Sequence, residues 1–274
     1  MSAKSESTVV AEEIAERMGV RALFVKMLHG MLEPVLAGPR AAGKDLGPAL
    51  AKIDALVDRM PVSSTVIETL ERVCTLDELV GMRDFYRSPI GARVSRFAVD
   101  EAETISGLLT RWALAALLGP ALRAAGISDR DAAQMGLPTG LTVTPAEWGG
   151  VDPMLRDEAI ATVTAIGFTR RIDDLVAAQA AQIGPLAPSL PPEQLAASVD
   201  KRIPIELVAR LYCEAFTRDE LAAIRAFYAT PIGQRTIELA PVFDRAGAEA
   251  MQSWMAANPG ALESELQGIA ALFE

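Results

Sequence analysis

The chain has 274 residues, enough for one large domain or two of ordinary size with a substantial core. Half of the residues are hydrophobic but only 5% are aromatic, and much of the apolar content is Ala and Leu, which favour helices, so we predict an all-α protein. The 36 acidic and 26 basic side chains give a net charge of -10, which argues against binding to nucleic-acid phosphates or anionic membrane surfaces.

The start of the chain carries no visible secretory signal, because a short polar stretch is followed by the charged sequence AEEIAERM. The sequence as written therefore predicts a cytoplasmic protein, although a chain from which an export signal had been removed would look the same. The longest apolar stretch, residues 112–122, is about half a membrane span and contains Pro120. We interpret it as a buried helix and predict no transmembrane segment.

Apolar residues near helical spacing predict three helices before residue 75. The first covers about 8–36 and is expected to bend or split at Gly19. A turn-rich segment leads to the second helix, which Pro61 ends. The third is predicted to start with a capping box formed by Thr65 and Glu68.

A nineteen-residue segment then occurs twice. Residues 75–93 (TLDELVGMRDFYRSPIGAR) match residues 217–235 (TRDELAAIRAFYATPIGQR) at eleven positions without a gap, at an offset of 142 (217 − 75). Trp112 and Trp254 have the same offset. The chain therefore contains two copies of one helical unit.

The duplication predicts the domain organisation. We expect a first helical unit at 1–125, a linker at 126–153 that is rich in Gly, Pro, Thr and Asp, and a second unit at 154–274. The linker can hold a short helix capped at Thr144. The two homologous multi-helix halves are expected to form a duplicated, pseudo-twofold helical bundle.

Each copy begins with the same helix start signal. Thr75 with Glu78, and Thr217 with Glu220, have the spacing of a capping box. The apolar residues that follow fall on one helical face and are predicted to be buried: Leu79, Met82, Phe85 and Tyr86 in the first copy, and Leu221, Ile224, Phe227 and Tyr228 in the second.

Each copy then predicts a tight corner between two helices. The residue before a proline is driven out of helical geometry, so the helices end at Ser88-Pro89 and Thr230-Pro231. The hydroxyl can cap the next helix, whose first position suits proline. The glycine two positions further on, such as Gly91, leaves room for another backbone to approach.

The repeated pattern resembles the bacterial domain-of-unknown-function family 2059, in two tandem copies. The resemblance rests on Thr75, Asp77, Glu78, Leu79, Phe85, Tyr86, Ser88, Pro89, Ile90, Gly91 and Arg93, and on Thr217, Asp219, Glu220, Leu221, Phe227, Tyr228, Thr230, Pro231, Ile232, Gly233 and Arg235. It implies an all-helical fold, usually exported to the bacterial periplasm, with no assigned activity. The second copy implies that the halves pack as an internal pseudo-dimer.

Residues with reactive or metal-binding side chains are few. Cys74 and Cys213 are not equivalent positions of the repeat and lack metal-ligand spacing, so two reduced, mostly buried thiols are favoured over a disulfide. His29 is the only histidine, and without convergent partners it is interpreted as a packing or surface residue. No phosphate-binding glycine loop or nucleophile elbow occurs, so no catalytic, cofactor or metal site is predicted.

The positions that a ligand or interface could use are repeated arginine and aromatic residues. They are Arg83, Arg93, Tyr86 and Trp112 in the first copy, and Arg225, Arg235, Tyr228 and Trp254 in the second. The arginines could hold a carboxylate or phosphate while the aromatics line an apolar chamber. The favoured alternative is structural: Arg83 pairs with an acid such as Asp84 or Glu78, and the aromatics fill the core. Arg93 and Arg235 have no structural explanation from the sequence.

Three functions follow from these observations. The favoured one is a non-enzymatic helical scaffold that binds another protein. The second is a carrier or sensor of a small apolar or amphipathic molecule held between helices, and the third is a hydrolase-like enzyme that uses scattered acids. The first is favoured because the preserved motif is architectural and no catalytic signature accompanies it.

Overall fold

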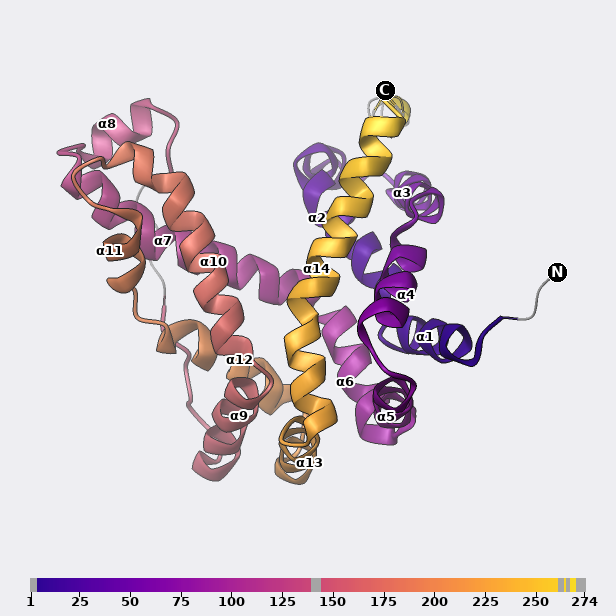
Figure 1. The fold of residues 1–274 in the computed structure, drawn as a ribbon. Coiled ribbons are helices and arrows are strands. Elements are labelled where there is room, and N and C mark those ends of the chain that lie inside the picture. The colour runs from indigo at the N-terminus through magenta and orange to yellow at the C-terminus, as the bar shows by residue number, and fades with distance from the viewer. Residues whose placement is uncertain (1–3, 139–143, 261–263, 265–266, 270–274) are drawn as a thin grey trace. The chain divides into compact units, whose positions relative to one another are not determined.

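The computed structural model describes residues 4–138, 144–260, 264 and 267–269, and every regular element in these ranges is a helix (Figure 1). The predicted all-α class is therefore confirmed. The chain forms two compact units. Unit 1 combines Met1–Glu103 with Thr230–Glu274, and unit 2 is Thr104–Ala229.

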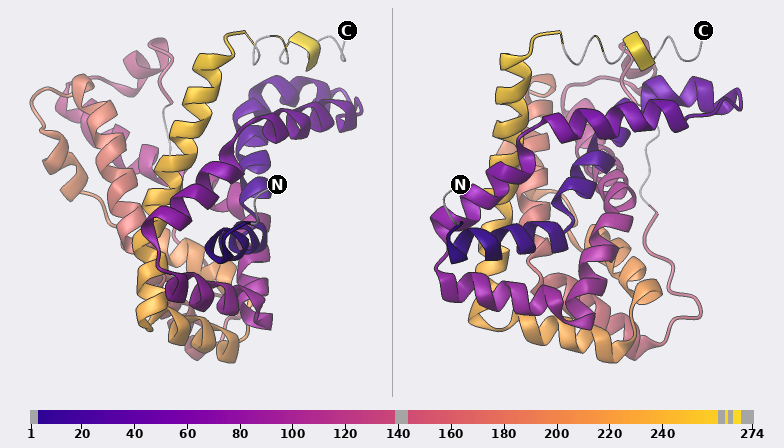
Figure 2. Two further views of the ribbon diagram at one scale, coloured as in Figure 1. Left: turned by 45° about the vertical axis from the view of Figure 1, so that its right-hand side comes forward. Right: turned by 90° about the vertical axis from the view of Figure 1, so that its right-hand side faces the viewer.

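Unit 1 takes its last helix from the end of the chain. Its helices are α1 (Glu6–Arg17), α2 (Val20–Ala41), α3 (Gly47–Arg59), α4 (Val62–Val73), α5 (Leu76–Arg87), α6 (Pro89–Asp100) and α14 (Pro231–Ala257). Helices α1 and α14 both lie against α4 and α5 (Figure 2). Ile14, Leu70, Leu79 and Met82 are fully buried among these helices. The core of unit 1 thus joins helices from both halves of the sequence.

Unit 2 contains the middle of the chain. Its helices are α7 (Ala102–Ala124, of which the first two residues fall in unit 1), α8 (Asp129–Gln134), α9 (Pro153–Ala165), α10 (Phe168–Ile183), the 3-10 turn η1 (Gly184–Leu186), α11 (Pro192–Ala197), α12 (Arg202–Ala215) and α13 (Arg218–Tyr228). Helix α9 lies against α12 and α13, as α1 lies against α4 and α5 in unit 1. Trp112, Ile172, Leu195 and Leu221 are fully buried.

The compact units divide the chain at different places from the predicted repeat boundaries. The boundaries between the compact units fall between Glu103 and Thr104 and between Ala229 and Thr230. The units at 1–125 and 154–274 and the linker between them describe the sequence repeat, and their pseudo-twofold arrangement stays a prediction.

Both copies of the repeat form the local structure that their residues predict. The Thr75 and Thr217 hydroxyls accept hydrogen bonds from the Glu78 and Glu220 backbone N–H groups, each at 3.3 Å, and both glutamates complete their capping boxes. The Ser88 hydroxyl accepts from the N–H of Gly91 at 3.0 Å, and Thr230 caps α14 in the same way. The predicted apolar faces are buried, except that Phe227 in α13 is half-buried.

Two glycines are required by the backbone. Gly19 separates α1 from α2 with φ of 70°, which confirms the predicted split of the first helix. At Gly91 the α5–α6 corner is so tight that a Cβ atom would lie 2.0 Å from the Phe85 carbonyl oxygen. The predicted close approach at this corner is therefore confirmed.

Two local predictions were wrong. Helix α4 begins at Val62, so Thr65 lies inside its first turn and donates its hydroxyl proton to the Pro61 carbonyl oxygen at 2.7 Å instead of forming a capping box. The segment from Thr144 to Trp148 is not helical. The short helix of this region is α8, where Ser128 caps the N-terminus through the Asp131 N–H.

One helix among the described residues, α7, is long and apolar enough to cross a membrane by length and composition. Trp112, Leu117 and Leu122 of this helix are buried within the protein, and Pro120 lies inside it. Core helices of proteins outside membranes have the same composition. The expectation that no segment spans a membrane stays a prediction.

Candidate functional site

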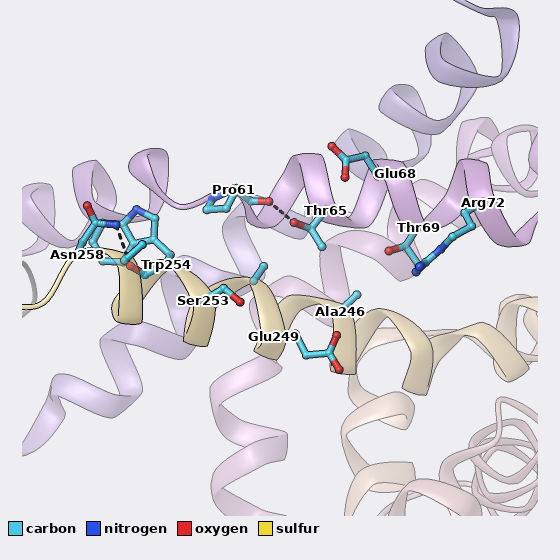
Figure 3. Close-up of a pocket in the computed structure, with 12 residues that line it drawn as sticks. Pro61, Thr65, Glu68, Thr69, Arg72, Ala246, Glu249, Ser253, Trp254 and Asn258 are labelled. Carbon is cyan, nitrogen blue, oxygen red and sulfur yellow. Dashed lines mark hydrogen bonds between the residues drawn. The ribbon is translucent and has the colours of Figure 1, made fainter.

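A hollow in unit 1 lies between α4 and α14, and we call it the α4–α14 groove. Its volume is about 630 Å³. It is lined by Pro61, Thr65, Glu68, Thr69, Arg72, Ala246, Glu249, Ala250, Ser253, Trp254, Ala257 and Asn258 (Figure 3).

Helical periodicity explains both walls of the groove. On α4, residues 65, 68, 69 and 72 fall on one face, while Val66 and Leu70 turn into the core. On α14, the positions 246, 249, 250, 253, 254 and 257 also share one face, and three of them are alanine. Small residues on this face leave space between two helices that otherwise pack together. The groove therefore results from the spacing of the polar residues along α4 and of the small residues along α14.

The groove has an aromatic end and a cationic end. Trp254, which is half-buried, and Asn258 lie near Pro61, and Arg72 lies at the opposite end (Figure 3). The Asn258 side chain donates to the Trp254 carbonyl oxygen at 2.8 Å, which ties the end of α14 together next to the indole. An indole in this position offers an apolar surface and a face that attracts cations.

The two walls each carry a carboxylate. Glu68 projects from α4 and Glu249 from α14, and both are exposed. Neither has an ion pair or a side-chain hydrogen bond within the part of the chain that the structure describes. With Arg72 the groove carries three charged groups and a net charge of -1. The electrostatics therefore favour a cationic group between the walls.

Nothing in the groove is arranged as an acid–base pair. The described residues that line it include no His, Cys, Lys or Tyr. Its carboxylates are not held in one orientation by other side chains, whereas catalytic carboxylates need such positioning. Across the described residues no three His, Cys, Asp or Glu side chains gather closely enough to hold a metal ion. The arrangement suits binding by shape and charge.

Arg235 receives the structural explanation that the sequence lacks. From α14 its Nη2 donates to the Val73 carbonyl oxygen at 2.7 Å, and its Nε lies 3.3 Å from Glu78 Oε1. Its Nη1 lies 3.2 Å from Glu238 Oε2 on its own helix. Val73 is the last residue of α4, so its carbonyl has no partner within the helix. Arg235 thus fastens α14 to the α4–α5 junction at the base of the groove.

This junction also determines the electrostatics of its neighbours. The hydrogen bond from the Thr75 N–H lowers the pKa of Glu78, and Arg235 lowers it further. Burial and the charge of Glu78 raise the pKa of the Cys74 thiol to about 11. Cys74 and Cys213 are both free and half-buried. A thiol with so high a pKa is a poor nucleophile, which agrees with a structural position.

The other predicted arginines lie outside the groove. Arg83 donates from Nε and Nη2 to Asp84 Oδ1 at 3.1 and 2.9 Å, which confirms the predicted pairing with that acid. Arg225 pairs with Glu158 of α9, with Nε 2.8 Å from Oε1. Arg93 lies on the exposed side of α6.

The predicted aromatic positions are mostly core residues. Trp112, Tyr86 and Tyr228 are buried, at 2%, 5% and 9% exposed. Only Trp254 lines the groove, and Trp112 does not. His29 is half-buried on α2, and its Nε2 lies 3.6 Å from Asp54 Oδ1 of α3. This position agrees with the interpretation of His29 as a packing residue.

Sequence reasoning missed the α4 wall of the groove. Thr65 and Glu68 were interpreted as the start of a helix, and Arg72 was given no role. The available signal is the polar stripe at positions 65, 68 and 72 opposite the buried stripe of α4. That signal cannot show that α14, more than 150 positions later, covers the same face.

The comparison with known families locates the resemblance in the second copy. A family described as an uncharacterized protein conserved in bacteria, DUF2059, matches residues 205–258. This segment includes the repeated motif at 217–235 and extends through the groove wall of α14. The predicted family resemblance is therefore confirmed for the second copy, and the presence of two tandem family copies stays a prediction. No curated protein and no solved structure matches the chain.

Proposed function

We propose that the protein is a non-enzymatic binding module that holds a basic amphipathic segment of another protein in the α4–α14 groove. The observation that carries the proposal is the pair of unpaired carboxylates, Glu68 on the α4 wall and Glu249 on the α14 wall, in a groove that also exposes part of Trp254. A Lys or Arg side chain of the partner fits between the walls. An apolar side chain fits against the indole.

The charge of the whole chain supports this choice of partner. A net charge of -10 attracts basic segments from a distance and speeds their association. The volume of about 630 Å³ accommodates several side chains of a bound segment but is small for a folded domain. The exposed large apolar side chains among the described residues come from different helices or helix ends, with Met154 and Met135 the most open. We therefore place the binding site in the groove.

The test uses two labelled peptides with the same pattern of Leu residues, one with Lys and one with Glu at every polar position. Fluorescence anisotropy at low salt should show binding of the Lys/Leu peptide only, and high salt should weaken it. The Glu68→Gln/Glu249→Gln double variant should raise its Kd about tenfold. Trp254→Ala should raise the Kd about thirtyfold, because an aromatic anchor of a binding site contributes about 2 kcal/mol.

Two matched variants control for general effects. Glu147→Gln removes an exposed acid, and Trp148→Phe changes a half-buried tryptophan, both outside the groove. Both should bind the Lys/Leu peptide like the original chain. Equal binding of the two peptides, or equal loss of affinity in the control and groove variants, would rule out the proposal.

A small-molecule carrier is the second candidate, because the groove volume also lies in the range of small-molecule sites, about 300–1,000 Å³. The neutral dye N-phenyl-1-naphthylamine distinguishes the two. If the dye binds in a Trp254-dependent manner and the Lys/Leu peptide does not bind, the carrier replaces the protein-binding module. If only the peptide binds, the carrier is excluded.

A further inference from the structure

The two walls of the α4–α14 groove are antiparallel helices that line it over similar lengths (Figures 1 and 3). The lining extends from Pro61 to Arg72 on one wall and from Ala246 to Asn258 on the other. At a rise of 1.5 Å per residue, these stretches are about 16 and 18 Å long. The groove therefore follows the helix axes for about three helical turns.

The backbone of both walls is already hydrogen-bonded. Both walls are α-helices, so their N–H and C=O groups bond within the helix except at its ends. At the end of α4, the Val73 carbonyl oxygen accepts a hydrogen bond from Arg235, and the Thr65 hydroxyl is donated to the Pro61 carbonyl oxygen. An extended segment satisfies its own backbone by pairing with the edge of a strand. A helical segment satisfies its backbone internally and can enter this groove without such an edge.

A row of small side chains runs along the α14 wall. Ala246 and Ala250 are each 7% exposed, and Ser253 and Ala257 continue the row at helical spacing. Small side chains let the axes of two helices approach closely, and a row at this spacing accepts the side-chain ridge of another helix. A helix in the groove presents only one of its faces to the walls. The volume of about 630 Å³, which accommodates several side chains, agrees with such a face.

We propose that the segment bound in the groove is an α-helix that lies along α4 and α14. This inference rests on the proposed function and adds the conformation and residue spacing of the partner. Trp254 and Glu249 are five positions apart on α14, a rise of about 7.5 Å. A partner helix with an apolar residue against the indole presents a basic residue on the same face four positions away, about 6 Å along its axis. The groove therefore recognises an apolar and a basic residue at i and i+4.

The test compares two labelled peptides of identical composition, each with one Leu and two Lys among Ala and Gln residues. In the helix-spaced peptide, the lysines lie four positions before and after the Leu, about 6 Å away along a helix. In the strand-spaced peptide, they lie two positions before and after it, about 6.6 Å away in an extended chain but on the opposite face of a helix. The symmetric placement makes the result independent of chain direction. Fluorescence anisotropy at low salt should give a Kd at least about tenfold lower for the helix-spaced peptide.

Two further comparisons connect this preference to helix formation and to the groove. A helix-spaced peptide with Pro between the Leu and one Lys should bind at least about tenfold more weakly, because Pro disrupts a helix interior. Ser253→Phe places a large side chain in the groove, whereas Gln252→Phe adds the same ring at an exposed position outside it. Ser253→Phe should abolish binding of the helix-spaced peptide, and Gln252→Phe should leave it unchanged.

The outcomes separate the helical partner from the proposed function. A strand-spaced or Pro-containing peptide that binds as tightly as the helix-spaced one, with binding lost in Ser253→Phe, would overturn the helix and keep the groove as the binding site. Binding that Ser253→Phe leaves unaltered would contradict the groove itself. If neither peptide binds, the Lys/Leu peptide decides: its binding overturns only the inferred spacing, and its failure to bind overturns the proposed function as well.

Discussion

Arg235 on α14 donates a hydrogen bond to the carbonyl oxygen of Val73 at the end of α4, 2.7 Å away and 162 residues earlier in the chain. A carbonyl oxygen in the last turn of a helix accepts no hydrogen bond from the helix itself, so it is free to accept one from a side chain. A cation at this end also interacts favourably with the helix dipole. The same side chain reaches Glu78, which caps α5. One residue of the second copy therefore fastens α14 to the α4–α5 junction at the start of the first copy, and with it the α14 wall of the groove.

Replacing Arg235 should destabilise unit 1. We expect Arg235→Ala to lower the free energy of unfolding by about 1–2 kcal/mol, because hydrogen bonds to a charged group are lost at a partly exposed site. Arg235→Lys should lower the free energy of unfolding by about half as much, because lysine keeps the positive charge but lacks the planar guanidinium group. Urea denaturation measures both. Arg245→Ala changes an exposed arginine of the same helix and should shift the free energy by less than about 0.5 kcal/mol.

The tightness of the α5–α6 corner gives a second prediction. Gly91→Ala places a Cβ against the carbonyl group of Phe85, so the two helices must separate, at a cost of about 2–3 kcal/mol. Gly30→Ala is the matched control, because the added Cβ meets no atom within 4 Å on α2. That variant should be more stable by about 0.5–1 kcal/mol. Thermal midpoints that fall equally in both variants would show that the corner is not close-packed in solution.

Two buried hydroxyls should respond differently to removal. Ser95→Ala should leave the free energy of unfolding unchanged or raise it by up to about 1 kcal/mol, since no hydrogen bond is lost. Thr162→Val should lower it by about 1 kcal/mol, because its hydrogen bond to the Leu221 carbonyl oxygen is lost. Urea denaturation compares them. A clear loss of stability in Ser95→Ala would show that a protein group satisfies this hydroxyl.

The cluster of Glu13 with Arg87 and Arg17 predicts a dependence of stability on pH. The folded pKa of Glu13, about 2, is below its ordinary value of 4.5, so its contribution is present above about pH 4.5 and is lost as the pH falls towards 2. Unfolding free energies measured at decreasing pH should fall less steeply in Glu13→Gln than in the original chain. Arg87→Gln should flatten the profile in the same direction, because it removes the main donor. An unchanged profile in both variants would contradict the ion pairs.

The parts of the fold that the sequence predicts are those that depend on residues within a few positions of each other. The Thr75 capping box, the Ser88 cap and the Gly19 break each involve short-range contacts, and all are present. The predicted capping box at Thr65 was wrong, because α4 begins directly after Pro61, earlier than the sequence pattern suggests. Local rules thus describe each helix and most of its ends.

The candidate site depends on contacts between residues far apart in the sequence, and a local sequence pattern does not predict such contacts. Arg235 was recognised as a repeated residue, but its contact with Val73 joins the two copies of the repeat. Trp254 was identified, whereas Glu68 and Arg72, which line the α4 wall of the same groove, were not. The assignment of α14 to unit 1 is what brings these residues together.

The most direct test of the α4–α14 groove maps the Lys/Leu peptide on the isotope-labelled chain by changes in backbone amide chemical shifts. We predict that the largest changes cluster at 65–72 and 246–258, the two walls of the groove, and that they disappear in Trp254→Ala. Changes centred on other helices, or a map that Trp254→Ala leaves unaltered, would contradict a binding site in the groove.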